Sequence, residues 1–194
     1  MTDGTSTVTV LLCGVGGQGT ILAADLLARS AIANGFKVKL SEIHGMAQRG
    51  GAVTTVVRFG NHVSSMVADL GSADRIIAFE TTEALRNEPF LKKNGILFVN
   101  DESIKPLPVL TGKTAMPKNA RERLVARGAK LIPASVLAQQ AGSAKTANVV
   151  LLGALAVDLS IDKNIWEEQI ALRVPQKTVD INIEAFRLGY HYFT

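Results

Sequence analysis

Residues 7–43 constrain the fold most, because an apolar strand, a glycine-rich loop, a helix and a second strand follow one another there. The run "TVTVLLC" (7–13) is short, apolar and β-branched, which is typical of a strand buried on both faces. Apolar residues recur at helical spacing over residues 21–34, Gly35 can end that helix as a C-cap, and residues 36–43 read as the next strand. This order predicts a parallel sheet with a right-handed crossover.

The rest of the chain continues the alternation of strands and helices. Further strands are predicted at residues 52–59, 75–79, 95–100 and 129–132, and helices at residues 81–86, 119–127, 135–141, 148–159, 166–172 and 181–189. Gly60-Asn61 is a turn signal, so residues 62–67 are predicted to form a β-hairpin with residues 52–59. We expect residues 1–194 to form a single three-layer α/β domain: a mostly parallel, Rossmann-like sheet with helices on both faces, plus this hairpin excursion.

Composition excludes several classes of function. The net charge of +4 is mild and scattered, and aromatic residues make up only 5% of the chain, so a nucleic-acid partner is not expected. Apolar runs stay shorter than the roughly 18 residues that span a membrane, and the N-terminus lacks signal-peptide features. We therefore expect a cytoplasmic protein without a membrane partner.

The single cysteine limits the metal chemistry open to this chain. Cys13 alone forms neither an intrachain disulfide nor a four-thiolate zinc or iron–sulfur site, so iron–sulfur electron transfer would belong to a partner. His44, His62 and His191 show no metal-ligand spacing, and no metal site is predicted. At the end of a buried strand, Cys13 reads as an inert core thiol, although a thiol–imidazole pair with His44 stays open.

The loop "GVGGQG" (14–19) fits more than one type of site. An ATP-binding loop needs a lysine after the last glycine, but Thr20 and Ile21 follow Gly19. The Gly-x-Gly-x-x-Gly spacing also matches a dinucleotide site, with Glu42 about twenty residues on as the ribose-binding acid, and it equally fits a tight turn of purely structural use. In each case the following helix directs free N–H groups and a positive dipole end at an anionic guest.

A second glycine-rich loop, "HGMAQRGG" (44–51), follows the second strand. Since neighbouring parallel strands end at the same edge of a sheet, we expect this loop beside residues 14–19, bringing Gln18, His44, Gln48 and Arg49 into one polar rim. Arg49 can grip a carboxylate or phosphate with two hydrogen bonds, and a salt bridge to an acid such as Glu42 or Asp69 is the equal alternative. His44 reads more simply as a hydrogen-bonded structural residue.

Four segments together resemble one family. "GVGGQGT" (14–20), "SEIHGMAQRGGAVTTVVRFG" (41–60), "ANVVLLGALA" (147–156) and "NIEAFRLGY" (182–190) look like the gamma-type domain of 2-oxoacid:ferredoxin oxidoreductases. The "HGMAQRGG" form is similar to the indolepyruvate type, beta subunit, whereas pyruvate and oxoglutarate types keep the Arg-Gly-Gly and vary what precedes it. The resemblance extends from about Val8 to Tyr190.

The resemblance implies a place in a larger enzyme. Such enzymes decarboxylate an aryl pyruvate oxidatively with coenzyme A, giving an aryl-acetyl-CoA, carbon dioxide and reduced ferredoxin. Thiamine diphosphate, Mg and the [4Fe-4S] clusters belong to a large alpha subunit, so this chain alone would bind no cofactor. The implied partners are that subunit, ferredoxin through the complex, the 2-oxoacid and coenzyme A.

By matching positions, the resemblance implies a functional rim without any catalytic or metal-binding residue. The rim consists of Gly14, Gly16, Gly17, Gln18, Gly19, Gln48, Arg49, Gly50, Gly51 and Asn148. Asn148 equally reads as the cap of the helix after it, "NVVLLGALAVDL" (148–159), which is apolar nearly all round. We expect that helix to be buried in the core or at a subunit contact, where an isolated copy could also form a homodimer.

Two other interpretations remain open from the sequence. The chain could be an NAD(P)- or FAD-binding Rossmann-type enzyme, or the subunit of a pyruvate- or 2-oxoglutarate-type relative. A protein whose loops serve assembly alone also fits the pattern.

Overall fold

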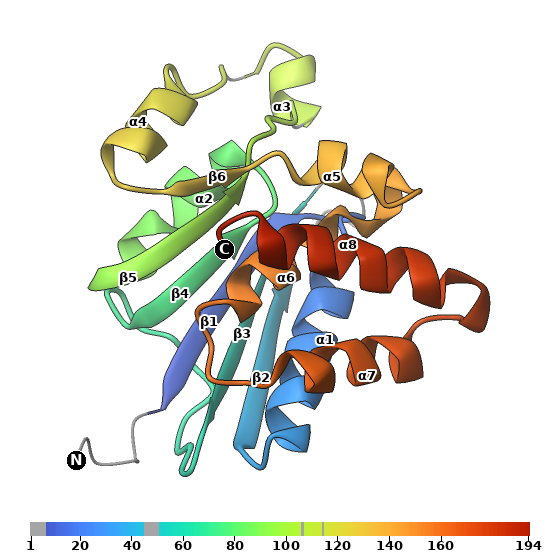
Figure 1. Ribbon diagram of the computed structural model, residues 1–194. Helices are drawn as coiled ribbons and strands as arrows, with labels where there is room; N and C mark the ends of the chain where they lie inside the picture. The colour runs from blue at the N-terminus through green and yellow to red at the C-terminus, as the bar shows by residue number, and fades with distance from the viewer. Residues whose placement is uncertain (1–6, 45–50, 106, 114) are drawn as a thin grey trace.

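A computed structural model describes residues 7–44, 51–105, 107–113 and 115–194, with only the backbone at 44, 107 and 108 (Figure 1). Its centre is a six-stranded sheet in the order β2-β3-β1-β4-β5-β6. The strands are β1 (Val8–Val15), β2 (Lys37–His44), β3 (Ala52–Gly60), β4 (Ala73–Ala78), β5 (Leu91–Asn100) and β6 (Lys130–Ile132). These lie close to the predicted segments, because buried apolar runs of this length have few alternatives to a strand.

The sheet is mostly parallel, as predicted. β1, β4, β5 and β6 pair in parallel, while β3 runs antiparallel to both β1 and β2. The expectation that β1 and β2 are neighbours is wrong, because β3 folds back from β2 and lies between them. A β-hairpin therefore exists, but it joins β2 to β3 inside the sheet.

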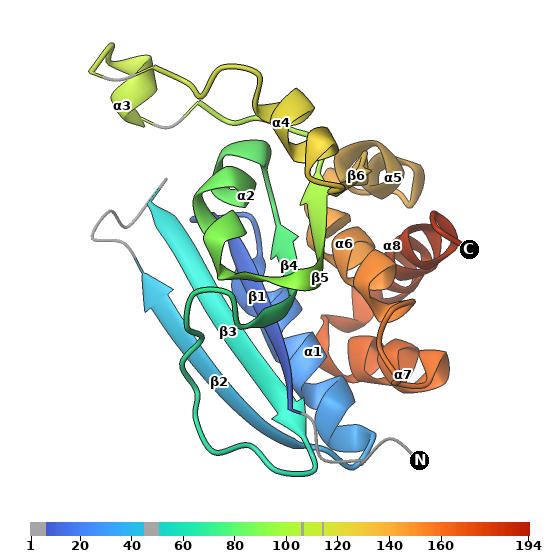
Figure 2. The same cartoon turned by 90° about the vertical axis from the view of Figure 1, so that its left-hand side faces the viewer.

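The hairpin predicted for residues 52–67 is wrong as well, since residues 62–67 form no strand. Instead, the long basic side chains of two sheet residues donate hydrogen bonds to the backbone carbonyl groups of this segment. Lys39 Nζ donates to the Ser64 carbonyl at 2.8 Å, and Arg58 Nη1 donates to the carbonyls of Ser65 and Val67 at 3.2 and 3.1 Å. The segment thus lies across the face of β2 and β3, as Figure 2 shows.

Helices cover both faces of the sheet, which confirms the predicted three layers. They are α1 (Thr20–Ala33), α2 (Thr81–Asn87), α3 (Leu107–Leu110), α4 (Ala120–Ala126), α5 (Ala134–Gln140), α6 (Ala147–Ala156), α7 (Lys163–Arg173) and α8 (Val179–His191). Single 3-10 turns occupy Glu88–Phe90, Ala144–Thr146 and Gln176–Thr178. No helix among the described residues has the length and apolar character needed to cross a bilayer.

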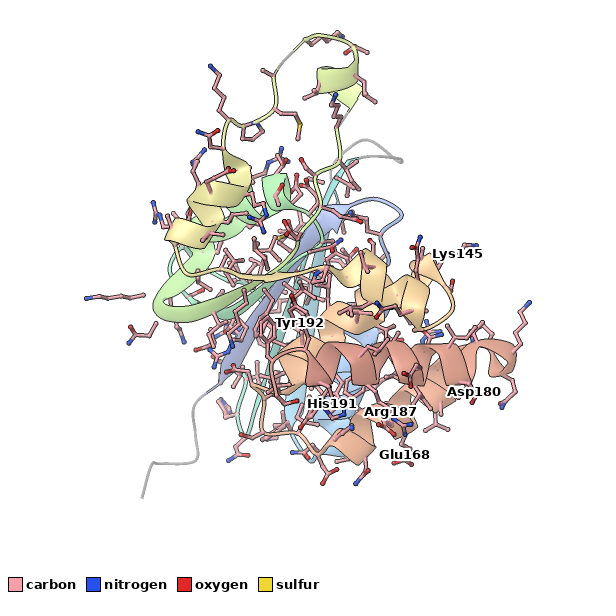
Figure 3. All side chains as sticks on the ribbon, turned by 45° about the horizontal axis from the view of Figure 1, so that its top comes forward. Lys145, Glu168, Asp180, Arg187, His191 and Tyr192 are labelled. Carbon is pink, nitrogen blue, oxygen red and sulfur yellow. The ribbon has the colours of Figure 1, made fainter. Side chains whose placement is uncertain are left out.

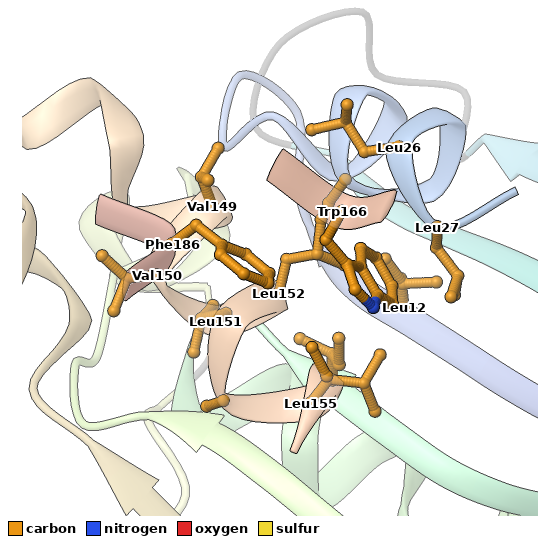
Figure 4. Close-up of a cluster of buried hydrophobic side chains, with 14 of the residues drawn as sticks. Leu12, Leu26, Leu27, Val149, Val150, Leu151, Leu152, Leu155, Trp166 and Phe186 are labelled. Atoms are coloured by element: carbon orange, nitrogen blue, oxygen red, sulfur yellow. The ribbon is translucent and has the colours of Figure 1, made fainter. Parts of the chain in front are cut away.

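The larger core lies between the sheet and the layer of α1, α5, α6, α7 and α8. α6 is at its centre, with Asn148 through Ala156 all buried. Figure 4 shows Trp166 of α7 and Phe186 of α8 beside α6; their rings stack with centroids 6.0 Å apart. The prediction that α6 is buried in the core is therefore confirmed, and the alternative of a subunit contact through α6 is wrong because this chain's own helices cover it. A homodimer of the isolated chain stays a prediction.

α6 and α8 approach so closely that glycine is required on both. A Cβ at Gly153 would overlap the Phe186 carbonyl, and a Cβ at Gly189 would overlap the Val150 carbonyl. On its outer side α8 carries Arg187, labelled in Figure 3. Arg187 Nη2 lies 2.6 Å from Glu167 Oε2 and so links α8 to α7. Hydrogen bonding to Arg187 holds the pKa of Glu167 below its ordinary value.

The smaller core lies on the opposite face of the sheet, beneath α2 and α4. It contains Leu11, Cys13 and Ile76 of the sheet, with Ala84 and Leu124 from the two helices. Both cores meet at strands whose residues alternate between the faces. The centre of the sheet is therefore covered on both faces, and its carboxyl edge, where β1, β4 and β5 end, carries the loops of the candidate site.

Candidate functional site

The first glycine loop connects β1 to α1 at the carboxyl edge of the sheet. Gly17 and Gly19 have φ angles of 99° and 78°, in the left-handed region that side-chain-bearing residues rarely adopt. A Cβ at Gly17 would meet no atom within 4 Å, whereas one at Gly19 would lie 2.6 Å from Asn148 Nδ2. The backbone therefore requires both glycines, and the space above Gly17 is open.

Gln18 folds back onto the loop. Its Oε1 accepts from the Val15 N–H at 2.7 Å, and its Nε2 donates to the Phe79 carbonyl at 3.3 Å. A Cβ on Gly14 would lie 2.5 Å from that same Oε1, so Gly14 makes room for the carboxamide. Gln18 thus fastens the loop to the end of β4.

Asn148 contacts the same loop from the other side. Its Nδ2 donates to the Gly19 carbonyl at 3.2 Å, and its side chain is only 4% exposed. Asn148 is inside the first turn of α6 and its Oδ1 accepts from the adjacent Val149 N–H at 3.0 Å, so it does not cap the helix from outside. The contact links the start of α1 to the start of α6.

Gly51, the last residue of the second glycine-rich loop, lies beside the first loop. Gly16 N–H donates to the Gly51 carbonyl at 3.0 Å, directly beyond the paired residues Val15 and Ala52. The predicted proximity is therefore confirmed at Gly51, although β3 rather than β2 brings it about. Gln48, Arg49 and Gly50 lie outside the described residues, as does the side chain of His44.

The start of α1 is suited to an anion. Its first turn carries no acidic residue, and its N-cap, Gly19, supplies no side chain to satisfy the first N–H groups. Such N–H groups lack helical partners and stand at the positive end of the helix dipole. Backbone donors beside the open space over Gly17 can therefore receive a carboxylate or phosphate oxygen.

The position of Glu42 counts against a dinucleotide site. Glu42 pairs with Thr55 of β3, and Thr55 pairs with Leu12 of β1. Two strand spacings, roughly 10 Å, thus separate β2 from β1. The ribose-binding acid of a dinucleotide fold stands on the strand next to β1, and here that strand is β3.

The carboxyl edge also holds a residue that the sequence reasoning missed. Asn100, the last residue of β5, is 3% exposed, and its Nδ2 donates to the Phe79 carbonyl at 3.4 Å, the carbonyl that Gln18 also contacts. The available signal was an amide side chain ending the buried run "GILFVN" (95–100) at the edge where the loops meet.

Cys13 has the environment of an inert thiol. Its Sγ donates to the Glu83 carbonyl at 3.6 Å, and burial raises its pKa well above the ordinary value, with the negative charges of Glu83 and Glu80 adding to the effect. The reactive thiolate is therefore disfavoured. Within the described part of the chain, no group of three His, Cys, Asp or Glu side chains is arranged to hold a metal ion.

Known proteins resemble this chain over nearly its whole length. The indolepyruvate oxidoreductase subunit IorB of Thermococcus kodakarensis is 41% identical over 187 residues, covering 93% of each chain. The crystal structure of a keto/oxoacid ferredoxin oxidoreductase gamma subunit from Geobacter sulfurreducens superposes with a TM-score of 0.70 at 26% identity, covering 94% of this chain and 96% of that one.

A more distant relative contains the same region within a longer polypeptide. The ketoisovalerate oxidoreductase subunit VorA of Methanothermobacter thermautotrophicus is 27% identical over 94% of this chain, which corresponds to only 35% of VorA. The model of the family "Pyruvate ferredoxin/flavodoxin oxidoreductase" matches residues 9–192. The chain, with its glycine loop held between β4 and α6, therefore belongs to the pyruvate ferredoxin/flavodoxin oxidoreductase family.

Proposed function

We propose that this chain is the small subunit of an indolepyruvate-type oxidoreductase and that the whole chain forms one gamma-type domain. The complex would decarboxylate aryl 2-oxoacids oxidatively with coenzyme A, passing the electrons to ferredoxin in the cytoplasm. The observation that carries the proposal is the similarity to an IorB subunit over 93% of both chains.

The cofactors of this reaction are proposed to reside in a larger partner subunit. The chain has a single cysteine, buried between β1 and α2, which does not fit a [4Fe-4S] cluster. Thiamine diphosphate and its Mg are assigned to the partner as well, since the described carboxylates form no metal-holding group. In VorA the matching region is only 35% of a longer polypeptide, which supports the proposal that this chain works with a larger partner subunit.

The contribution of this chain is proposed to be an anion-binding rim at the boundary with that partner. Backbone donors at Gly17 and Gly19 with the start of α1 would receive the 2-oxoacid carboxylate or a coenzyme A phosphate, while Gly16, whose N–H donates to the Gly51 carbonyl, would hold the loop in place. Gly14 and Gln18 would shape the loop, Asn148 would hold its end, and Gln48, Arg49, Gly50 and Gly51 would complete the rim. The start of α1, where the first N–H groups have no helical acceptor, lies beside open space at Gly17, and this supports the role.

The first experiment is reconstitution with the large subunit encoded by the same organism. The complex should reduce ferredoxin faster with indolepyruvate and coenzyme A than with pyruvate or 2-oxoglutarate. A preference for either smaller acid would assign the chain to the other type of 2-oxoacid oxidoreductase. Failure of the two subunits to associate would contradict the proposal.

Calorimetric titration of the isolated chain tests the dinucleotide alternative. We expect no sub-millimolar binding of NAD⁺, NADP⁺ or FAD, because Glu42 is separated from the glycine loop by β3. Sub-millimolar binding of any of the three would favour a Rossmann-type enzyme instead.

A further inference from the structure

The Phe79 carbonyl is a junction between the glycine loop and the rest of the carboxyl edge. Phe79 follows β4 directly, and its N–H donates to the Cys13 carbonyl at 2.8 Å. Its carbonyl accepts from Gln18 Nε2 at 3.3 Å and from Asn100 Nδ2 at 3.4 Å. Two carboxamides, one from the loop and one from β5, thus fix the same atom.

Both the nitrogen and the oxygen of the Asn100 carboxamide form hydrogen bonds, and these bonds connect three parts of the fold. Besides the bond to Phe79, its Nδ2 donates to Glu102 Oε2 at 3.1 Å, and its Oδ1 accepts from the Ala134 N–H at 3.1 Å. Ala134 begins α5, whose N-cap, Pro133, supplies no side-chain acceptor. Asn100 therefore joins β4, β5 and the start of α5 with its buried polar atoms satisfied.

Two other buried asparagines make only local contacts, unlike Asn148, which bonds to the Gly19 carbonyl. Asn182 Nδ2 donates to the Thr178 carbonyl at 2.7 Å, and Asn87 Nδ2 donates to the Glu83 carbonyl at 2.9 Å, each four residues back. The bonds of Asn100 to Phe79 and Ala134 span 21 and 34 residues. A local bond supports its own helix, whereas those of Asn100 set how separate elements meet at the edge.

We propose that Asn100 is a positioning residue for the glycine loop, acting through the Phe79 carbonyl and Gln18. Because Asn100 fixes the Phe79 carbonyl, the Gln18 carboxamide is held in one position, and the backbone N–H groups of Gly17 and Gly19 keep one orientation toward an anionic group. The inference rests on the proposed anion-binding role of that loop. Asn100 itself would touch neither the 2-oxoacid nor coenzyme A.

The test uses Asn100→Asp in the reconstituted complex. Aspartate keeps the acceptor for Ala134 but replaces the donor with an oxygen that faces the Phe79 carbonyl and Glu102. We expect KM for the 2-oxoacid or for coenzyme A to rise about tenfold, the effect of losing one hydrogen bond that orients the donors. Hydrogen exchange at the amides of residues 15–22 in the free chain should become faster.

The matched control is Asn182→Asp, which alters a similarly buried amide whose hydrogen bond goes to Thr178, four residues back. It should leave KM and exchange at residues 15–22 unchanged. If Asn100→Asp does not fold, Asn100→Ser removes the carboxamide donor, together with the acceptor for Ala134, without adding a charge. An unchanged KM in a folded Asn100 variant, with exchange at residues 15–22 as slow as in the parent, would overturn the inference.

Coupling to Gln18 separates positioning from general stability. Gln18→Glu removes the other donor to Phe79 and keeps the acceptor for the Val15 N–H. Because both carboxamides act through one carbonyl, the double variant should raise KM by less than the product of the two single effects. Independent, multiplicative effects would contradict the shared route.

The variant Gly17→Ala distinguishes a failure of the proposed anion-binding loop from a failure of the proposed role of Asn100. An unchanged KM in that variant would reject the loop as an anion site and with it the proposed rim. A raised KM in Gly17→Ala alongside an unchanged KM in Asn100→Asp would reject the positioning role alone.

Discussion

Two regions of this molecule depend on glycine for opposite reasons. In the loop between β1 and α1, Gly17 has a φ of 99° and open space where a side chain would be. Where α6 crosses α8, Gly153 and Gly189 are helical, and a side chain on either would overlap a carbonyl of the other helix. The loop needs the backbone freedom of glycine, while the crossing needs its small size.

The difference separates residues that build the fold from residues that shape the site. The segments "ANVVLLGALA" and "NIEAFRLGY" carry the glycines of the helix crossing, and "GVGGQGT" carries those of the loop. Substitutions at the crossing should therefore lower stability, whereas those at the exposed loop position should mainly change ligand binding.

The largest effect is expected at the helix crossing. Gly153→Ala or Gly189→Ala should lower the free energy of unfolding by about 3 kcal/mol, because backbone atoms of the facing helix must move. Urea unfolding followed by circular dichroism measures this. A loss below that of an open-site glycine would show that the helices separate easily and that the crossing is not close-packed.

A smaller loss is expected for Gly19→Ala. The left-handed backbone costs about 1–2 kcal/mol for alanine, and the new Cβ would displace the Asn148 carboxamide. Asn148→Ala isolates the second part, since it removes the hydrogen bond to Gly19 and leaves the glycine. Equal stability of Gly19→Ala and the parent protein would contradict the observed loop conformation.

Gly17→Ala should cost only the backbone strain, about 1 kcal/mol. Gly35→Ala is the matched control, because Gly35 follows the other end of α1 with a φ of 89° and equally open space. The two variants should shift the urea midpoint alike. A much larger shift for Gly17→Ala would reveal packing over the loop.

The smallest effect is expected from Glu83→Gln and depends on pH. Burial raises the pKa of Glu83 above its ordinary value of 4.5, Arg86 opposes the rise and Glu80 adds to it. The folded state then holds its proton more tightly than the unfolded state, so the parent loses stability as pH rises from 4.5 through the raised pKa. The variant should be more stable at pH 7 and nearly equal at pH 4. A difference that does not vary with pH would contradict this.

The elements themselves could be predicted because their signals are local. β1, β4 and β5 are short apolar runs, and α6 is apolar all round because it is buried on every side. The order of the strands could not be predicted from local signals, since nothing in residues 36–60 indicates that β3 pairs with β1. The hairpin was wrongly predicted for the same reason. Residues 64–67 are held by hydrogen bonds from Lys39 and Arg58, which lie next to them only in the folded sheet.

The site was predictable in part for the same reason. Glycines at 17 and 19 mark a special backbone, and Asn148 does reach the loop. Asn100 was missed because its partners, Phe79 and Ala134, come next to it only through the pairing of β4 with β5 and β5 with β6. Whether the rim residues contact a ligand stays a prediction.

The most direct test of the distinction between the two glycine regions is a kinetic comparison in the reconstituted complex. KM for the aryl 2-oxoacid and for coenzyme A should be measured with Gly17→Ala and with its control Gly35→Ala. The account predicts that Gly17→Ala raises at least one KM about tenfold, because the anion-facing donors change direction, while Gly35→Ala leaves both unchanged. Equal KM values in the two variants would contradict a ligand-binding role for the loop.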